Sequence, residues 1–296
     1  MGLGAGSKLV ERLPRCALIL GYGSGVITQS GYSSLSKTQI DLIVVVSNRD
    51  EFLLELERRM IITKCNRVAC SLIQPEVCFF SDVELDSDKL YKIGVVEAGN
   101  FLRKLCDWDS SFYVPGRLQK PVKILYCESR NFEHRVQVAL ESNRRSALAA
   151  ALLMFPDEQR HKFDVTSLFS SLVRLSYLGD IRMNFAENPK KVQNIVSAQS
   201  RLLLNLYEPH FEKVGIVRAS SGGLICHKSP SGLWNDLPIN FRRHAIQLAD
   251  PQKALEATLS RINARESAYQ AFAGLGTSGL TNSFRYLVRK VSKRFR

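Results

Sequence analysis

Two stretches decide the fold: CALILGYGSGV, residues 16–26, and QIDLIVVV, residues 39–46. The run from Cys16 to Leu20 is short and apolar and ends in a glycine-rich turn, which predicts a buried strand. The second stretch is rich in β-branched residues and carries a single acid, Asp41, which predicts another strand. Closely spaced glycines let backbone N–H groups converge on a phosphate, and Ser24 adds a hydroxyl donor. The two stretches therefore predict a phosphate-binding loop followed by an acid in an apolar strand.

Outward from this pair, strand and helix patterns alternate as far as residue 130. The pattern predicts a helix from about residue 50 to 62, strands near 76–81 and 90–97, a helix around 100–108, a Pro/Gly loop, and a strand at 122–127. This alternation predicts an α/β domain over residues 16–130, preceded by an N-terminal segment, residues 1–15.

From Asn131 onwards the hydrophobic period is helical. Helices are expected up to Pro156, at 165–176 and at 190–207, with a small hairpin at 214–225 around a Ser-Ser-Gly-Gly turn. Helices with one hairpin predict a winged-helix-like domain over residues 131–230. The region 231–296 is expected to be helical and basic.

The charge and composition limit the class of partner. The formal net charge of +13 favours anionic partners: nucleic acid, nucleotide phosphates or an acidic lipid surface. No stretch approaches the roughly 18 apolar residues of a membrane-spanning helix, so the chain is expected to be soluble or peripheral. The seven cysteines form no CxxC pair and the five histidines are scattered, which indicates reduced core thiols rather than a zinc site.

The C-terminal end predicts a basic amphipathic helix. No Asp or Glu follows Glu266, and the last 16 residues carry six Arg or Lys. Apolar residues recur there at helical spacing, so we expect the helix to lie on an anionic membrane surface. The same apolar face could instead pack onto the protein's own core. The expected membrane-binding residues are Phe284, Arg285, Leu287, Arg289, Lys290, Lys293 and Arg294.

A Gly-Ser loop followed by an acid in an apolar strand is typical of the DNA polymerase beta-like nucleotidyltransferase fold. In that fold the loop holds a triphosphate and the acid binds Mg²⁺, a role that here falls to Asp41. The usual second acid, two residues further on, is replaced by Ile43. The sequence leaves four possible substitutes for it: Asp82, Glu84, Glu97 and Asp180.

Three later motifs make the reading more specific. They are YVPGRLQKPVKI at 113–124, LSYLGDIRM at 175–183 and KVQNIV at 191–196. With GYGSGV and IDLIVVV, they resemble the mitochondrial CDP-diacylglycerol synthase family, the phosphatidate cytidylyltransferases of the translocator assembly and maintenance protein type. The resemblance runs in order from about Leu18 to Tyr207.

The resemblance implies a nucleotidyltransferase domain and a winged-helix domain with the active site in the cleft between them. It implies that CTP and phosphatidate react to CDP-diacylglycerol and diphosphate with Mg²⁺, feeding cardiolipin and phosphatidylglycerol synthesis. The place implied is the matrix side of the inner mitochondrial membrane, where the protein would be peripheral. The catalytic residues carried over are Asp41, Lys92 and Asp180. The residues carried over for CTP and phosphate binding are Gly21, Gly23, Ser24, Arg117, Lys120, Lys123 and Arg182.

The chain also departs from the family pattern, and two other functions remain open. Thr28 replaces a basic residue, Glu51-Phe52 replaces a Trp-His pair, and Phe80 replaces an asparagine near the third strand. One alternative is an RNA-directed nucleotidyltransferase, although no interleaved aromatic and basic stripe is present for stacking bases, so no nucleic acid partner is expected. The other is a non-catalytic mitochondrial assembly factor on a nucleotidyltransferase scaffold.

Overall fold

The structure, a computed structural model, describes residues 9–23, 25–27, 39–86, 89–109, 111–185, 188–220 and 222–269. The chain divides into two compact units. Unit 1 comprises Met1–Leu102, Val122–Gln137 and Ala268–Arg296, and unit 2 comprises Arg103–Pro121 and Val138–Ser267. Each unit therefore contains more than one stretch of chain, and the predicted domain bounds at residues 15, 130 and 230 stay predictions.

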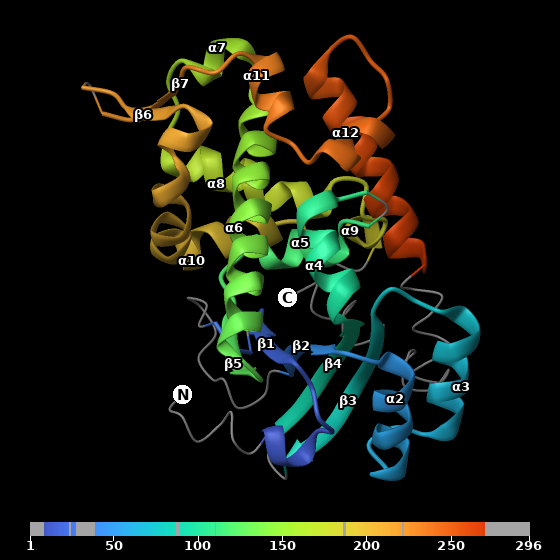
Figure 1. The fold of residues 1–296 in the computed structure, drawn as a ribbon. Coiled ribbons are helices and arrows are strands. Elements are labelled where there is room, and N and C mark those ends of the chain that lie inside the picture. Colours follow the sequence, from blue (N-terminus) through green and yellow to red (C-terminus); the bar gives the residue numbers. More distant parts are fainter. Residues whose placement is uncertain are drawn as a thin grey trace. The chain divides into compact units, whose positions relative to one another are not determined.

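Unit 1 contains a five-stranded mixed sheet in the order β3-β4-β2-β1-β5 (Figure 1). Its strands are β1 (Leu18–Tyr22), β2 (Ile40–Val46), β3 (Cys78–Asp86), β4 (Lys89–Glu97) and β5 (Lys123–Cys127). Strands β2 and β4 are parallel, and the other neighbours are antiparallel. The sheet confirms the predicted α/β class and the predicted strands. Its assignment to the polymerase beta-like fold remains a prediction.

One face of the sheet packs against helices α2 (Arg49–Arg58) and α3 (Lys64–Ile73) (Figure 1). The side chain of Asn48 accepts hydrogen bonds from the N–H groups of Asp50 and Glu51, and this N-cap starts α2. Thr63 and Asn66 form a capping box that starts α3. The core between these helices and the sheet contains alternate residues of β2, namely Ile40, Leu42, Val44 and Val46. Asp41 and Ile43 therefore point to the opposite face.

Unit 2 is mainly helical around one apolar core that includes Trp108, Leu148, Phe169 and Phe241. Helices α4 (Ala98–Asp107) and α6 (Arg130–Leu153) contain residues of both units. The other labelled helices are α5 (Tyr113–Leu118), α7 (Asp157–Arg160), α8 (Val165–Arg174), η2 (Leu175–Tyr177), α9 (Arg182–Phe185), α10 (Lys191–Tyr207), η3 (Glu208–His210), η4 (Glu212–Val214), α11 (Pro230–Asn235) and α12 (Ile239–His244). Residues 9–12 and 251–269 are also helical.

The predicted hairpin of unit 2 is confirmed as β6 (Ile216–Arg218) and β7 (Leu224–Cys226), which pair antiparallel. Phe163 forms an isolated antiparallel bridge to Leu224, on the side of β7 opposite β6. Helices at 130–153, 165–174 and 191–207 match the predicted helical segments. The winged-helix description of this region remains a prediction.

Three sequence-based expectations differ from the structure. Residues 113–118 are the helix α5 rather than a loop, because Pro115 stands at the third helical position, where a backbone N–H has no intrahelical partner. Helix α3 was not predicted, although Thr63 is a capping signal for it. Not every cysteine is in the core, because Cys65 and Cys106 are exposed.

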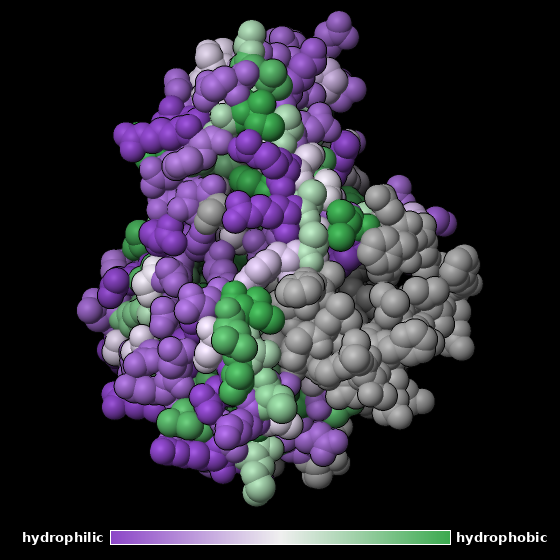
Figure 2. Space-filling view, turned by 90° about the vertical axis from the view of Figure 1, so that its right-hand side faces the viewer, coloured by the Kyte–Doolittle hydropathy of each residue, from purple (hydrophilic) through white to green (hydrophobic). Residues whose placement is uncertain are grey.

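Within the described residues, no helix is both long and apolar enough to cross a membrane. On the face shown in Figure 2, hydrophilic residues predominate and the hydrophobic ones gather in a few small patches. The predicted membrane-binding residues, from Phe284 to Arg294, lie outside the part of the chain that the structure describes.

Candidate functional site

In unit 1, the glycine-rich turn after β1 lies against the carboxylate of Asp41. Tyr22, the last residue of β1, pairs with Asp41, near the start of β2. Gly23 follows with a φ of +74°, and a Cβ atom there would lie 2.9 Å from Asp41 Oδ2. Gly25 approaches the neighbouring chain so closely that a Cβ would lie 2.5 Å from the carbonyl oxygen of Gln39. Glycine is therefore favoured at Gly23 by its backbone conformation and needed at Gly25 for space.

Lys92 lies on β4 beside Asp41. The two residues are paired in the parallel register of β2 and β4, so their side chains leave the same face of the sheet. Lys92 is half-buried, and its Nζ lies 4.8 Å from the centre of the Phe79 ring, a cation–π distance. Phe79 in turn packs over Gly94, where a Cβ would lie 2.5 Å from its Cε1 atom. Phe79 therefore helps to position Lys92 next to Asp41.

Two candidates for the second acid, Glu97 and Asp82, differ in how far they lie from Asp41 along the strands of the sheet. Glu97 pairs with Val46, five residues along β4 from Lys92, which is about 16 Å along the strand. Asp82 lies in a β-bulge of β3 between residues paired with Ile93 and Tyr91, which is the level of Lys92 and Asp41. Its Oδ1 accepts a hydrogen bond of 3.3 Å from Gln39 Nε2. Glu97 is thus too distant to act with Asp41, whereas Asp82 is at the same level.

The remaining predicted residues near the glycine turn and the sheet differ in their exposure. Ile43, at the usual position of the second acid, is completely buried, so this position is part of the packing. Glu84 is exposed on β3 opposite Leu90. Lys123 is exposed on β5 and pairs with Gly21 of β1, which places it beside the glycine turn. Ser24 lies outside the described residues.

Phe80, the departure from the family asparagine, does not face Asp41. It pairs with Ile93 and belongs to the apolar core beneath α2 and α3. Only 4% of Phe80 is exposed. Its neighbour Phe79 contacts Lys92 on the other face. The residue that replaces the family asparagine is therefore a core residue in this chain.

In unit 2, helix α5 and the turn that follows it carry two of the predicted basic residues, Arg117 and Lys120. The guanidinium of Arg117 lies 3.4 Å above the ring of Tyr113, in a cation–π contact. Lys120 Nζ donates a short hydrogen bond to the carbonyl oxygen of Gly116 and another of 3.1 Å to Ser176 Oγ. These contacts hold both cations in fixed positions, in contrast to a solvated loop.

Asp180 and Arg182 form a bidentate ion pair. Arg182 donates from Nε to Asp180 Oδ1 at 2.9 Å and from Nη2 to Oδ2, and its backbone N–H also bonds to Oδ1. Asp180 is 4% exposed. Burial alone would raise the pKa of Asp180, but the hydrogen bonds and charge of Arg182, helped by the charge of Arg117, outweigh it and lower the pKa. Asp180 is therefore an ionised carboxylate among cations.

A further lysine, Lys191, joins this group at the start of α10. Its Nζ lies 5.4 Å from the centre of the Tyr177 ring, and Lys120 Nζ lies 5.7 Å from the same centre. Burial lowers the pKa of Lys120 well below its ordinary value, and the positive charges of Arg117 and Lys191 lower it further. We call Arg117, Lys120, Arg182 and Lys191, with Asp180, the cation cluster.

The sequence did not identify every member of this group. Lys191 opens the KVQNIV motif and Ser176 and Tyr177 lie in the LSYLGDIRM motif, so the motifs were a signal for all three residues, although none of the three was named as a site residue. Arg182 and Arg117 interact with Asp180, and Lys120 and Lys191 lie at the Tyr177 ring, so the cation cluster contains four cations and one carboxylate. Such a cluster is suited to bind an anion with several negative charges, such as a triphosphate or a phosphate monoester.

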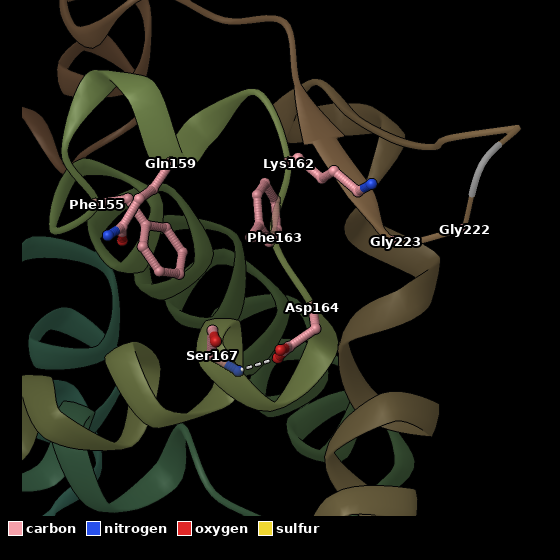
Figure 3. Close-up of a pocket in the computed structure, with 8 residues that line it drawn as sticks. All are labelled: Phe155, Gln159, Lys162, Phe163, Asp164, Ser167, Gly222 and Gly223. Carbon is pink, nitrogen blue, oxygen red and sulfur yellow. Dashed lines mark hydrogen bonds between the residues drawn. The ribbon is translucent and has the colours of Figure 1, made fainter.

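A pocket of about 480 Å³ lies elsewhere in unit 2, between the α7–α8 segment and the hairpin (Figure 3). Phe155 and Phe163 stack in it with ring centres 5.3 Å apart. Its carboxylate, Asp164, caps α8 by accepting a 2.6 Å hydrogen bond from the N–H of Ser167 (Figure 3). The pocket contains no predicted site residue, and Lys162 is the only cation among the residues that line it. The cation cluster and the Asp41 region are therefore the better candidates.

The chain was compared with known protein families and with individual proteins. A family described as "Phosphatidate cytidylyltransferase, mitochondrial" matches residues 7–231. This range contains Asp41, Lys92 and all members of the cation cluster.

The relatives carry the same description. The protein named mitochondrial phosphatidate cytidylyltransferase from Saccharomyces cerevisiae is 31% identical over 95% of this chain and 68% of its own length. Proteins of the same name from Mus musculus and Schizosaccharomyces pombe are each 30% identical, covering 94% and 93% of this chain and 90% and 79% of their own lengths. The chain therefore belongs to the family of mitochondrial phosphatidate cytidylyltransferases, a family of nucleotidyltransferases.

Proposed function

We propose that this chain transfers the cytidylyl group of CTP to phosphatidate, forming CDP-diacylglycerol and diphosphate. The family relationship supports the activity. The observation that carries the proposal is the cation cluster, in which desolvation, and then the charges of Arg117 and Lys191, lower the pKa of the half-buried Lys120. Holding like charges together costs free energy, and bound phosphates would offset that cost.

The reaction needs charge neutralisation more than it needs a base. Phosphatidate is a phosphate monoester with a second pKa of about 6, so it is mostly a dianion at neutral pH. One of its oxygens attacks the α-phosphorus of CTP, a new P–O bond forms, and the bond to the β-phosphate breaks to release diphosphate. Both reactants are anions, so Arg117, Lys120 and Lys191 would lower their repulsion and hold them in line.

Asp41 and the glycine turn are suited to a Mg²⁺ ion bound with the nucleotide. The carboxylate of Asp41 lies beside the space that a Cβ at Gly23 would fill, where backbone N–H groups and a phosphate could come together. No group of three or more His, Cys, Asp or Glu side chains in the described ranges could hold a metal alone, so phosphate and water oxygens would complete the coordination. When bound, Mg²⁺ would neutralise negative charge on the phosphates.

The test is to incubate the purified chain with radiolabelled CTP and either phosphatidate-containing vesicles or tRNA. Labelled CDP-diacylglycerol supports the proposal. Label in tRNA would favour the RNA-directed alternative, and no product with either would favour a non-catalytic scaffold; the comparisons favour neither. Asp41→Asn should lose at least about 100-fold in kcat/KM and keep its thermal midpoint, because a half-buried Asp is replaced by an isostere. Near-normal turnover of this variant would refute the role of Asp41.

We also propose a peripheral location on the matrix side of the inner mitochondrial membrane. The relatives are named mitochondrial, and phosphatidate is a membrane lipid that an enzyme must approach at the bilayer surface. The basic C-terminal segment, which includes Phe284 and Arg289, would supply the anchor.

A further inference from the structure

Helix α5, which carries Arg117, has little local support of its own. It is six residues long and contains Pro115 and Gly116, and no side chain caps its first turn. Isolated helices of this length are unstable in water, and glycine lowers helix stability further. The position of Arg117, and of Lys120 just after the helix, therefore depends on contacts between α5 and the rest of unit 2.

The first of these contacts comes from a buried asparagine of α6. Asn143 has no exposed surface. Its Nδ2 donates a hydrogen bond of 3.1 Å to the carbonyl oxygen of Pro115, and its Oδ1 accepts one of 2.8 Å from Trp108 Nε1. An indole N–H can only donate and a carbonyl can only accept, so one orientation of the amide satisfies both partners. Asn143 thereby ties α5 to the residue that follows α4.

Trp108 is itself held in place from several sides. Its φ of +51° is an unfavourable backbone conformation for a bulky residue. The indole ring packs edge-on against Phe112 and Phe241, with ring centres 4.8 and 5.9 Å away. Unfavourable conformations persist only where the surrounding structure maintains them, and they are frequent near functional groups. The chain between α4 and α5 therefore follows a path that these contacts fix.

The second contact comes from the end of α10. Tyr207 has no exposed surface, and its hydroxyl donates a hydrogen bond of 2.7 Å to the carbonyl oxygen of Gln119. Gln119 is the residue at the C-terminal end of α5, where carbonyl groups have no partner inside the helix. Asn143 and Tyr207 thus bond to two carbonyl groups at the C-terminal end of the helix.

The position of α5 also decides the contacts of Lys120. Its Nζ bonds to the carbonyl oxygen of Gly116 in α5 and to Ser176 Oγ in η2. The two segments are so close that a Cβ at Gly116 would lie 2.8 Å from the Ser176 Cβ. A displacement of α5 away from η2 would therefore break the bond between Lys120 and Ser176, and it would move Arg117 as well.

We propose that Asn143 and Tyr207 are positioning residues for the reaction. By bonding to carbonyl groups of α5, they hold Arg117 and Lys120 in the arrangement that binds the phosphates of the substrate. The inference rests on the proposed function, because it requires that the cation cluster binds an anionic substrate. Both positioning residues are uncharged and fully buried, so they act through the helix and do not touch the substrate.

Tyr207→Phe tests this role, because it removes one hydroxyl and keeps the ring in the core. The probe is inorganic tripolyphosphate, titrated calorimetrically into the full chain at a temperature where every variant is folded. We expect its dissociation constant to rise about tenfold, and kcat/KM for CDP-diacylglycerol formation to fall by a similar factor. The matched control is Tyr91→Phe, which removes the hydroxyl of another buried tyrosine, bonded to Asp86 Oδ2 in unit 1. It should lower the thermal midpoint but leave tripolyphosphate binding unchanged.

A second pair of variants tests the contact from α6. Asn143→Ala should weaken tripolyphosphate binding at least as much as Tyr207→Phe. Ser146→Ala, on the same helix, removes a hydrogen bond to the carbonyl oxygen of Asp236 and should not weaken it. Amide hydrogen exchange of α5 should be faster in Asn143→Ala and Tyr207→Phe than in the parent chain.

Two results would overturn the inference. If α5 exchanges faster in Tyr207→Phe while tripolyphosphate binds as it does to the parent chain, the hydroxyl only stabilises the helix and does not position the cations. If the parent chain binds no tripolyphosphate, the anion site itself is refuted. Because binding is measured without turnover, a parent chain that binds the probe but forms no CDP-diacylglycerol would refute the proposed activity alone, and the comparison of the variants would still decide the positioning role.

Discussion

Replacing Gly23 by alanine should damage catalysis far more than stability. Gly23 has a φ of +74°, and an alanine there would carry a strain of about 1–2 kcal/mol. Its Cβ would also lie 2.9 Å from Asp41 Oδ2, closer than an ordinary van der Waals contact of about 3.4 Å. The Asp41 carboxylate must therefore move by roughly half an ångström. Because a displacement of about 1 Å in an active site can cost about 100-fold in rate, we expect kcat/KM to fall by about 10- to 100-fold.

The chain offers a matched control for this change. Gly222, in the turn of the β6–β7 hairpin, has a φ of +80°, and a Cβ there would meet no atom within 4 Å. Gly222→Ala should therefore carry the same backbone strain without touching any candidate site. Both variants should lower the thermal midpoint by about 2–4 °C per kcal/mol.

The assay measures CDP-diacylglycerol formation at varied CTP, alongside thermal unfolding of each variant. Only Gly23→Ala should lose activity per folded molecule. Both variants could instead have a lowered thermal midpoint and similar activity. In that case the turn at Gly23 does not serve catalysis, and the placement of the nucleotide beside Asp41 is wrong.

Four further changes test other parts of the structure. Lys120→Met should abolish most activity yet raise the free energy of unfolding at pH 7, measured in denaturant titrations. Folding lowers the pKa of Lys120, so the charged lysine destabilises the folded state at pH 7, and this destabilisation fades as pH rises toward the ordinary pKa of 10.5. The difference in the free energy of unfolding between the variant and the parent protein should therefore shrink at high pH. Asp180→Asn should lower the free energy of unfolding by about 2 kcal/mol at pH 7. The pKa of Asp180 is lowered in the folded protein, so this loss should disappear as pH falls below the ordinary pKa of 3.8. If the loss of stability did not change with pH, the ion pair would be contradicted. Phe80→Asn should lower stability by about 3 kcal/mol in the same titrations without improving kcat/KM, because Phe80 is a core residue. Truncation after Thr281 should abolish sedimentation with cardiolipin-containing liposomes but leave activity on detergent-dispersed phosphatidate; unchanged liposome binding would exclude the C-terminal anchor.

The strands of unit 1 could be predicted because their sequences strongly favour a strand over other secondary structures. Ile40 to Val46 is an almost continuous β-branched run, and the structure confirms it as β2, with its side chains buried on both faces except at Asp41. Helix α3 could not be recognised in the same way. Its sequence, KCNRVACSLI, has no strong helix-forming run, and the helix buries only Cys70.

The grouping of the candidate residues was predictable where a motif contained them, while their roles stay predictions. Arg117, Lys120, Asp180 and Arg182 were expected from the family resemblance, and the structure places them in one cluster of unit 2. The role of Tyr177 could not be predicted, because it depends on two lysines, 57 and 14 residues away in the sequence, that contact its ring. Contacts of this kind follow from tertiary packing and leave no local pattern.

The position of β1 in the sheet has a consequence for synthesis of the chain. β1 pairs on one side with β2 and on the other with β5, where Gly21 lies opposite Lys123. A ribosome adds about 5–20 residues per second, so β5 emerges roughly 5–20 s after β1. During that interval, the free edge of an apolar strand is open to pairing with other nascent chains. Until β5 arrives, the nascent chain therefore exposes one unpaired edge of β1.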